Sequence, residues 1–325
     1  MTPPSRQPAP DTAGSGRPRV PRRRDDRERY GTRILWAGFA APGAIWLIVL
    51  FVVPFYVMLA VAAGQINAFF QTAVPVWNPL DWSGANFATV WHDVFGPGAF
   101  LGGQAVRTVV YTAIAASLCL AIAFPVAYFV SRYSGRRKTL FLVLLIAPFW
   151  VSYMMRMLAW IDLLQTNGYV NRALAFFRLP GHNTNWLGGD SVTVVLGLVY
   201  GYIPYLILVL YAGLDRIDKN LLEASRDLGL GKWRTFWRVT VPLAKPTIIA
   251  GSFVTVLPML GDYYTNQLLS AAPGTTMIGN GIEGLLGSPG EQGQGAALAL
   301  LLLVVLLVPM GYYVISTARA SRENI

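Results

Sequence analysis

The sequence is poor in the residues that build redox, metal and hydrolytic sites. Its 325 residues contain one cysteine, Cys119, and two histidines, His92 and His182. A single cysteine excludes an intrachain disulfide and a thiolate metal cluster. Cys119 lies in an apolar run, so we expect it to be a small core residue. Neither histidine has a metal-ligand partner at a useful spacing, so we expect both at the surface and predict no metal site.

Charged residues are also scarce. They make up 13% of the chain, whereas 54% of the residues are hydrophobic; a soluble domain has about 25% charged residues. The net charge of +10 would suit a nucleic-acid-binding protein if the cations shared one face. They instead gather in clusters that flank apolar runs, which is the positive-inside pattern of membrane proteins, so we expect no nucleic-acid partner. These clusters lie in residues 1–33, 132–138, 216–245 and 319–322.

Six apolar segments are long enough to cross a membrane as helices, since a hydrocarbon core of about 30 Å needs roughly 20 apolar residues. An even number of spans places both termini on one side, and the basic clusters predict that this side is the cytoplasm. The sequence therefore predicts an all-α integral membrane protein with six transmembrane helices and cytoplasmic N- and C-termini. The predicted spans are Ile34–Ala63, Thr108–Val130, Thr139–Leu164, Val192–Gly213, Pro246–Leu269 and Ala296–Ile315.

The two ends of the chain are polar. Residues 1–33 are rich in Pro, Arg, Gly and Ser and have almost nothing apolar to bury, so they are predicted to form a disordered basic cytoplasmic tail. The following run, 34–63, is about twice as long as a signal-peptide core of about 7–15 residues, which favours a retained first transmembrane helix. We expect an extracytoplasmic loop over 64–103 and a cytoplasmic C-terminal tail over 316–325.

Prolines interrupt three of the predicted spans, at Pro148, Pro204 and Pro258, and Gly261 follows the last of these. A proline removes one backbone hydrogen bond and kinks a helix. Interrupted helices at mid-membrane are common where a pathway or cavity lies, although membrane helices also tolerate proline without a function. The outer segment Gly279–Gly295 is rich in glycine and is expected to be irregular.

The polar segment between the fourth and fifth spans has the signals of two short helices. Asp218 is a candidate N-cap for a helix beginning at Lys219, and Gly229 is a candidate left-handed C′ residue that ends it. Residues 232–238 alternate cations with tryptophan and phenylalanine, as expected of an amphipathic helix at the membrane surface. Pro242 is predicted to stop this second helix before the fifth span begins.

The same segment carries an ordered motif. It has an acid, two small residues, a glycine six positions after the acid and a more distant proline. This spacing resembles the EAA loop of ABC importer permeases, from which it departs by Ser225 for Ala, Val239 for Ile and Val241 for Leu. In that family the loop meets the ATPase subunit, so the resemblance implies a coupling role here. The coupling residues that it implies are Glu223, Ala224, Ser225, Asp227, Gly229 and Pro242.

The resemblance implies a type I ABC importer permease fold, with the permease domain over residues 104–315, in a bacterial cytoplasmic (inner) membrane. It implies a second homologous permease subunit, two copies of a cytoplasmic ABC ATPase and an extracytoplasmic binding protein as partners, besides membrane lipid. Gly231-Lys232 does not fit a phosphate-binding P-loop, because Arg226 and Trp233 stand where a glycine and a Ser or Thr are required. We therefore expect no cofactor on this chain, with ATP and Mg bound by the ATPase.

Several further stretches are similar to the spermidine/putrescine permeases within this class, and so imply a polyamine-binding protein as partner. They are Ala147–Trp160, Gly201–Tyr205, Leu260–Tyr263 and Met277–Asn280. Permeases for iron, thiamine, sulfate or opines could share them, so these substrates stay open. A membrane-embedded enzyme would need a nucleophile–base or metal constellation at membrane depth, and no such motif is present. A passive channel would not require the EAA loop.

Polyamine chemistry directs attention to acids and aromatic residues near the spans. Asp262 and Asp162 are candidate ligands for ammonium groups, because intramembrane acids usually line a cavity or pair with a cation. Arg156 would repel a polycation, and the alternative is an intramembrane Arg156–Asp262 ion pair. Aromatic faces add cation–π attraction. The candidate aromatic residues of the pathway are Trp150, Tyr153, Trp160, Tyr263 and Tyr264.

Overall fold

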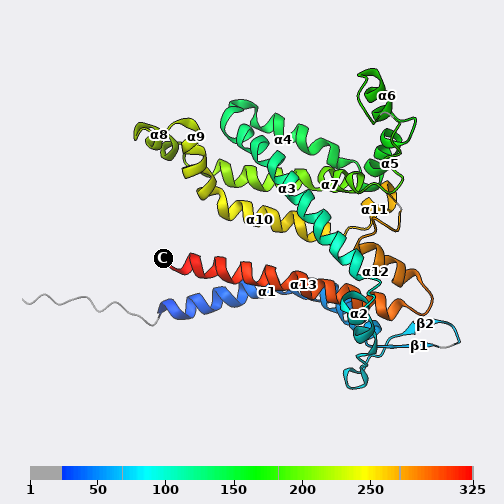
Figure 1. Ribbon diagram of the computed structural model, residues 1–325. Coiled ribbons are helices and arrows are strands. Elements are labelled where there is room, and N and C mark those ends of the chain that lie inside the picture. Colours follow the sequence, from blue (N-terminus) through cyan, green and yellow to red (C-terminus); the bar gives the residue numbers. More distant parts are fainter. Residues whose placement is uncertain (1–23, 68, 182, 271, 324–325) are drawn as a thin grey trace, which may run out of the picture. The chain divides into compact units, whose positions relative to one another are not determined.

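The computed structural model describes residues 24–67, 69–181, 183–270 and 272–323, and these residues are mostly helical (Figure 1). His182 and residues 1–23 of the predicted tail lie outside them. The chain divides after Tyr56 into two compact units. His92 is exposed beside Asp93 (Nδ1 to Oδ1, 3.8 Å), as expected of a surface histidine.

The first helix is longer than the sequence predicts. Helix α1 spans Arg24–Ala62, so the prediction of disorder fails for residues 24–33. Four of these ten residues are arginine, which is a good helix former. Extending an existing helix also adds one hydrogen bond per residue without a new nucleation cost. The part of α1 with the length and hydropathy of a membrane span is Gly38–Ala62.

The connection from α1 to the next long helix is structured. Strands β1 (Gln65–Asn67) and β2 (Thr72–Val74) form an antiparallel hairpin. A 3-10 turn over Pro79–Asp81 leads to helix α2 (Ala85–Phe95). One apolar cluster joins the end of α1, α2 and α13 (Gln292–Glu323), and includes the buried Val90 and Leu298.

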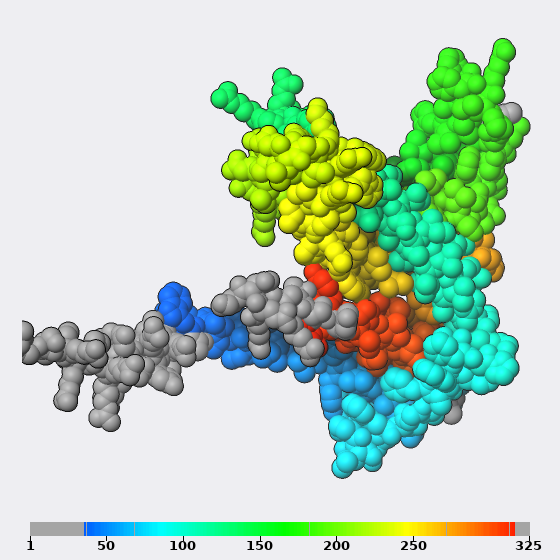
Figure 2. Space-filling view, turned by 60° about the vertical axis from the view of Figure 1, so that its left-hand side comes forward, coloured from blue at the N-terminus to red at the C-terminus, as the bar shows by residue number. Residues whose placement is uncertain are grey.

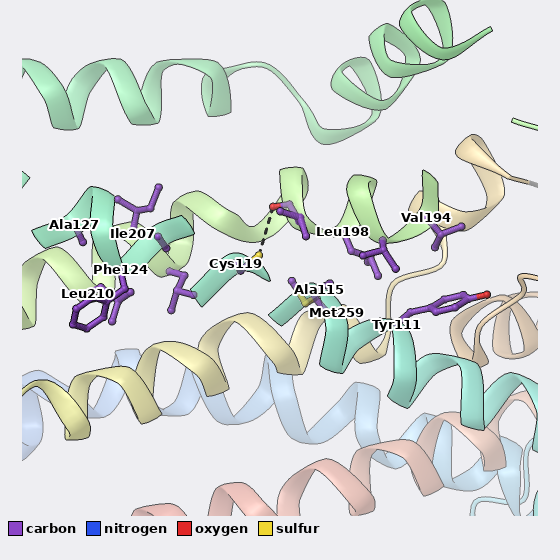
Figure 3. Packing of buried hydrophobic residues seen from close by; sticks show 14 of the residues in the cluster. Tyr111, Ala115, Cys119, Phe124, Ala127, Val194, Leu198, Ile207, Leu210 and Met259 are labelled. Carbon is purple, nitrogen blue, oxygen red and sulfur yellow. Dashed lines mark hydrogen bonds between the residues drawn. The ribbon is translucent and has the colours of Figure 1, made fainter. Parts of the chain in front are cut away.

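The main core lies between helices α3 (Gly102–Tyr133), α7 (Ser191–Asp215) and α10 (Val241–Leu260). The face that α3 turns to α7 is a row of small residues four apart, which lets the two backbones approach closely. The thiol of Cys119 donates to the carbonyl of Val199 at 3.7 Å and is fully buried, which confirms its core position (Figure 3). The small residues in this row are Ala115, Cys119, Ala123 and Ala127.

The predicted third span is broken rather than continuous. A 3-10 turn (Gly135–Arg137) and helix α4 (Lys138–Ile146) follow α3. Pro148 then opens a second 3-10 turn over Ala147–Trp150, and helix α5 begins only at Tyr153. Extended backbone at Val151 and Ser152 separates the two parts, and the Ser152 hydroxyl caps α5 by accepting from the N–H of Met155 at 3.3 Å.

This break bends the segment by 86° between Gly135–Trp150 and Tyr153–Phe176. The described residues therefore contain five helices long and apolar enough to cross a membrane, or six when the bent pair is taken as one span. Helix α5 ends at Leu164, and α6 covers Tyr169–Phe176.

The fifth predicted span ends early. Helix α10 stops at Leu260, Asp262 lies in the connection, and a short helix α11 covers Tyr264–Leu269. The expected irregular segment after it is wrong, because α12 forms a regular helix over Ile278–Gly287. Asn280 makes the start of α12 favourable, since its side-chain oxygen accepts from the backbone N–H of Met277 at 3.0 Å.

Pro242 does not end the helix that precedes α10. Helices α8 (Lys219–Asp227) and α9 (Lys232–Thr235) form as two short elements, and a π-helical segment over Phe236–Thr240 then joins α9 to α10. A π turn shifts the hydrogen bonds by one residue, so a proline can be placed in the first turn of α10 without a clash. The result is a continuous helix over Lys232–Leu260.

Candidate functional site

Helix α8 has the local geometry that its sequence predicts. The Asp218 side chain accepts from the N–H of Asn220 at 2.9 Å and caps the helix. At the other end, Gly229 has φ of +86°. Its N–H donates to Arg226 at 2.9 Å and that of Leu230 to Ser225 at 3.2 Å, which is the hydrogen-bond pattern of a Schellman motif.

The residues of the EAA motif divide between the surface and the interior. Glu223, Ala224, Asp227 and Gly229 are exposed, and Leu228 is 86% exposed. The exposed face of α8 therefore carries an apolar side chain, Leu228, one turn after the small residue Ala224. Figure 2 shows the yellow-green atoms of α8 and α9 uncovered on this face of the molecule.

Two residues of the motif, Ser225 and Pro242, do not lie on the exposed face of α8. Ser225 is buried, and its hydroxyl donates to the carbonyl of Leu222 at 2.8 Å and to the hydroxyl of Thr235 at 3.2 Å. It therefore joins α8 to α9 and does not lie on the exposed surface. Pro242 is exposed in the first turn of α10.

Two cations hold the start of this segment to the end of α3 and to α4. Nη2 of Arg132 donates to the carbonyls of Leu214 at 2.9 Å and Ile217 at 3.0 Å, at the C-terminal end of α7. Lys138 forms an ion pair with Asp215. These contacts join the end of α7, directly before α8, to α3 and α4.

A second site lies around Asp262, at the break between α10 and α11. The carboxylate is 7% exposed and accepts four hydrogen bonds, which compensate for its burial. Oδ2 accepts from the hydroxyls of Tyr153 at 3.0 Å, Tyr202 at 2.9 Å and Thr265 at 2.6 Å. Oδ1 accepts from the backbone N–H of Thr265 at 2.9 Å.

These groups border a pocket of about 310 Å³. Tyrosines from three parts of the chain surround the acid: Tyr153 comes from α5, Tyr202 from α7, and Tyr263 from the connection before α11. The ring of Tyr263 stacks on Tyr264 with 4.2 Å between centroids. A buried carboxylate among aromatic faces is suited to bind an ammonium group. The residues that line the pocket are Tyr153, Gly201, Tyr202, Tyr205, Pro258, Gly261, Asp262, Tyr263 and Tyr264.

The candidate Arg156–Asp262 ion pair does not form. Within the described residues, no Arg156 nitrogen lies within 4.0 Å of a carboxylate. The guanidinium carbon lies 4.1 Å from the centroid of the Phe149 ring and 5.4 Å from that of Tyr153. Aromatic rings surround this cation in place of the acid. Tyr153 lies between the two groups: its hydroxyl bonds to Asp262, and its ring faces Arg156.

The other candidate pathway residues lie apart from the pocket. Trp150 is 80% exposed, and Trp160 packs edge-on against Tyr200 with 5.3 Å between centroids. Asp162 is exposed, and its side chain accepts from Nε2 of Gln165 at 3.2 Å. Of the predicted pathway residues, the structure brings Tyr153, Asp262, Tyr263 and Tyr264 together.

Sequence reasoning missed four residues of this site, namely Tyr202, Tyr205, Thr265 and Gly201. Tyr202 lies in a stretch that the resemblance singled out, but nothing in the sequence places it against Asp262. The signal that the sequence does contain is a glycine inside an apolar span, because glycine allows another group to lie close to the helix. In the structure, a Cβ at Gly201 would lie 2.8 Å from Cε2 of Tyr153. The glycine therefore lets the Tyr153 ring lie directly on α7.

A family described as the inner membrane component of binding-protein-dependent transport systems matches residues 27–322. The chain belongs to this family. The permease is a transport component of an ABC importer, not an enzyme, and it is a multi-pass protein of the bacterial inner membrane. These findings confirm the predicted class and location.

Two similar permeases match more than three fifths of the chain. The spermidine/putrescine transport system permease protein PotB of Escherichia coli (strain K12) is 35% identical over 209 residues, which is 64% of this chain and 74% of that protein. The inner membrane ABC transporter permease protein YdcU of the same strain is 34% identical over 212 residues, or 62% of this chain and 67% of that protein.

A solved structure extends the likeness to the fold. A chain from a bacterial ABC transporter involved in the import of the acidic polysaccharide alginate superimposes with a TM-score of 0.62. The likeness covers 91% of this chain and 99% of that chain at 18% sequence identity. The permease therefore has the predicted all-α fold of a type I ABC importer permease.

Proposed function

We propose that the permease imports polyamines, spermidine or putrescine, by ATP-driven alternating access. The observation that carries this proposal is the Asp262 pocket, in which a buried carboxylate is surrounded by tyrosine rings. An ammonium group entering the pocket would exchange its hydration for the carboxylate and the aromatic faces. Cation–π contacts contribute about 0.5–2 kcal/mol each, depending on how fully the cation loses water.

The pocket argues against sulfate and against bulky substrates. Sulfate would meet the negative charge of Asp262, and the lining of the pocket offers it no cation. The volume of about 310 Å³ is at the small end of the range for ligand pockets, roughly 300–1,000 Å³, which suits a slender amine better than a bulky one. The name of PotB supports the same substrate class by similarity.

The transport cycle that we propose requires partners. A second homologous permease subunit would complete the pathway, and an extracytoplasmic polyamine-binding protein would deliver the substrate. Two copies of an ABC ATPase, which bind ATP and Mg, would contact α8 through Glu223, Ala224, Asp227 and Gly229. Ser225 would hold α8 to α9 through its bond to Thr235, and Pro242 lies in the first turn of α10. Closure of the ATPases would move α8, and Arg132 would pass this movement to α3.

Uptake of labelled spermidine tests the proposal. Cells with the gene intact, deleted and restored are compared, with and without depletion of ATP, in a strain that lacks other polyamine transporters. We expect uptake to disappear on deletion, to return on restoration and to depend on ATP. Excess unlabelled putrescine should compete, whereas excess thiamine should not.

Each alternative predicts a different result in this assay. Uptake that persists after ATP depletion would indicate a passive channel. Unchanged spermidine uptake after deletion would refute the polyamine assignment and leave the permease class intact. Competition by thiamine, with no effect of putrescine, would assign the importer to that substrate.

A further inference from the structure

An apolar groove of about 720 Å³ lies beside α8 and is separate from the Asp262 pocket. One wall is the second half of α3, from Leu120 to Tyr133, and the other is formed by Phe236, Val241 and Ile248. Because a helix rises about 1.5 Å per residue, the α3 wall is about 20 Å long. Such a length is sufficient to hold much of a hydrocarbon chain parallel to the helix.

One end of the groove is cationic and aromatic. Arg226 of α8 and Lys232 of α9 line it there, next to Trp233, which is 72% exposed, and Trp237, which is 53% exposed. Within the part of the chain that the structure describes, neither cation has a carboxylate within 4.0 Å. Tryptophan at the end of a membrane helix is typical of the interface between lipid and water.

The groove does not fit the substrate that we propose. No acid is among its lining residues, and a polyamine would meet the positive charges of Arg226 and Lys232. A soluble partner also fits poorly, because the groove follows a segment of α3 that has the hydropathy of a membrane span. An amphipathic anion matches both ends: an apolar chain for the walls and a negative headgroup for the two cations.

We propose that this groove binds an anionic phospholipid. One acyl chain lies along α3 between Leu120 and Tyr133, and the phosphate lies between Arg226 and Lys232. The headgroup thereby links α8 to α9 across the turn at Gly229. Because α8 carries the exposed residues of the EAA motif, bound lipid would restrict the movement of this surface and make coupled transport depend on the lipid composition.

Native mass spectrometry of the intact transporter tests the site. The complex is purified through a tag on this chain and titrated with vesicles of phosphatidylglycerol or of phosphatidylcholine. We expect the wild-type complex to retain phosphatidylglycerol and the double variant R226Q/K232Q to retain at least about fivefold less. The control R216Q/K219Q removes the same charge from exposed positions outside the groove and should behave as wild type. Equal retention by the first variant and wild type would overturn the proposal.

A second variant tests the apolar part. Ala121→Trp fills the groove from α3, and we expect it to displace the lipid while the partner subunits still co-purify. Loss of the partner subunits with this variant would identify the groove as a protein interface and overturn the proposal. Unchanged lipid retention would show a headgroup contact at the surface alone, which also contradicts binding in the groove. Neither result depends on whether the substrate is a polyamine.

Discussion

The substitution Asp262→Asn tests the proposed ammonium site directly. It removes the negative charge and keeps the size of the side chain. The amide oxygen can still accept from the N–H of Thr265, and the two amide hydrogens can be donated to the hydroxyls of Tyr153 and Tyr202, which then act as acceptors. The Thr265 hydroxyl loses its bond to Oδ2 but keeps the one to the Tyr153 hydroxyl. Because the local hydrogen bonds can be rebuilt in this way, we expect the variant to insert and assemble normally.

The expected loss of substrate binding follows from electrostatics. Two unit charges about 4 Å apart interact by about 4 kcal/mol at an effective dielectric constant of about 20. The pocket is open to solvent, so we expect about 2–4 kcal/mol, or a rise of roughly 30- to 700-fold in the spermidine concentration that gives half-maximal uptake. Concentration-dependent uptake in proteoliposomes containing the complete transporter measures this change.

Asp162→Asn is the matched control. Asp162 is exposed and is bonded only to Gln165 among the described residues, so uptake should stay within about twofold of wild type, as surface substitutions usually do. Tyr202→Phe removes one hydrogen bond to Asp262 and keeps the ring, so its effect should be intermediate. Wild-type uptake by a fully assembled Asp262→Asn transporter would refute the proposed role of this pocket.

Three further variants test the coupling segment and the core. Gly229→Val places a β-branched residue at φ of +86° and should cost about 1–3 kcal/mol, lowering substrate-stimulated ATPase activity; Gly231→Val, in extended backbone, is the control. Arg132→Gln removes bonds from α3 to the end of α7, so uptake should fall further than basal ATPase activity; equal declines would contradict a coupling role. Gly213→Ala brings a Cβ within 2.1 Å of Oγ1 of Thr247 and should cost about 1–3 kcal/mol in thermal unfolding.

The features that sequence reasoning predicted well depend on local interactions. The cap at Asp218 and the left-handed Gly229 involve residues a few positions apart, so their geometry follows from the local order of side chains. Hydropathy likewise indicated the long apolar helices, because a membrane span is defined by length and composition. The helical start of α1 at Arg24 was missed, since low hydrophobicity argues against packing but not against helix formation.

The break in the third span was indicated only in part. Pro148 predicts a kink, but proline alone allows a continuous helix, as Pro204 in α7 demonstrates. The bend of 86° arises because a 3-10 turn, two extended residues and a new cap at Ser152 follow in succession. How these local choices combine depends on packing of α5 against α7 and α11, which sequence patterns do not describe.

The sequence by itself therefore determined the class of the protein, its helices and the local form of the EAA segment. Only the tertiary structure decided which acids and cations meet. Tyr153 and Asp262 are 109 positions apart, yet their side chains lie in hydrogen-bond contact, while Arg156, in the next turn after Tyr153, stays with aromatic rings. Long-range contacts of this kind depend on how whole helices pack. The row of small residues on α3 and Gly201 beside Tyr153 allow close packing, but the sequence does not show which helix packs against them.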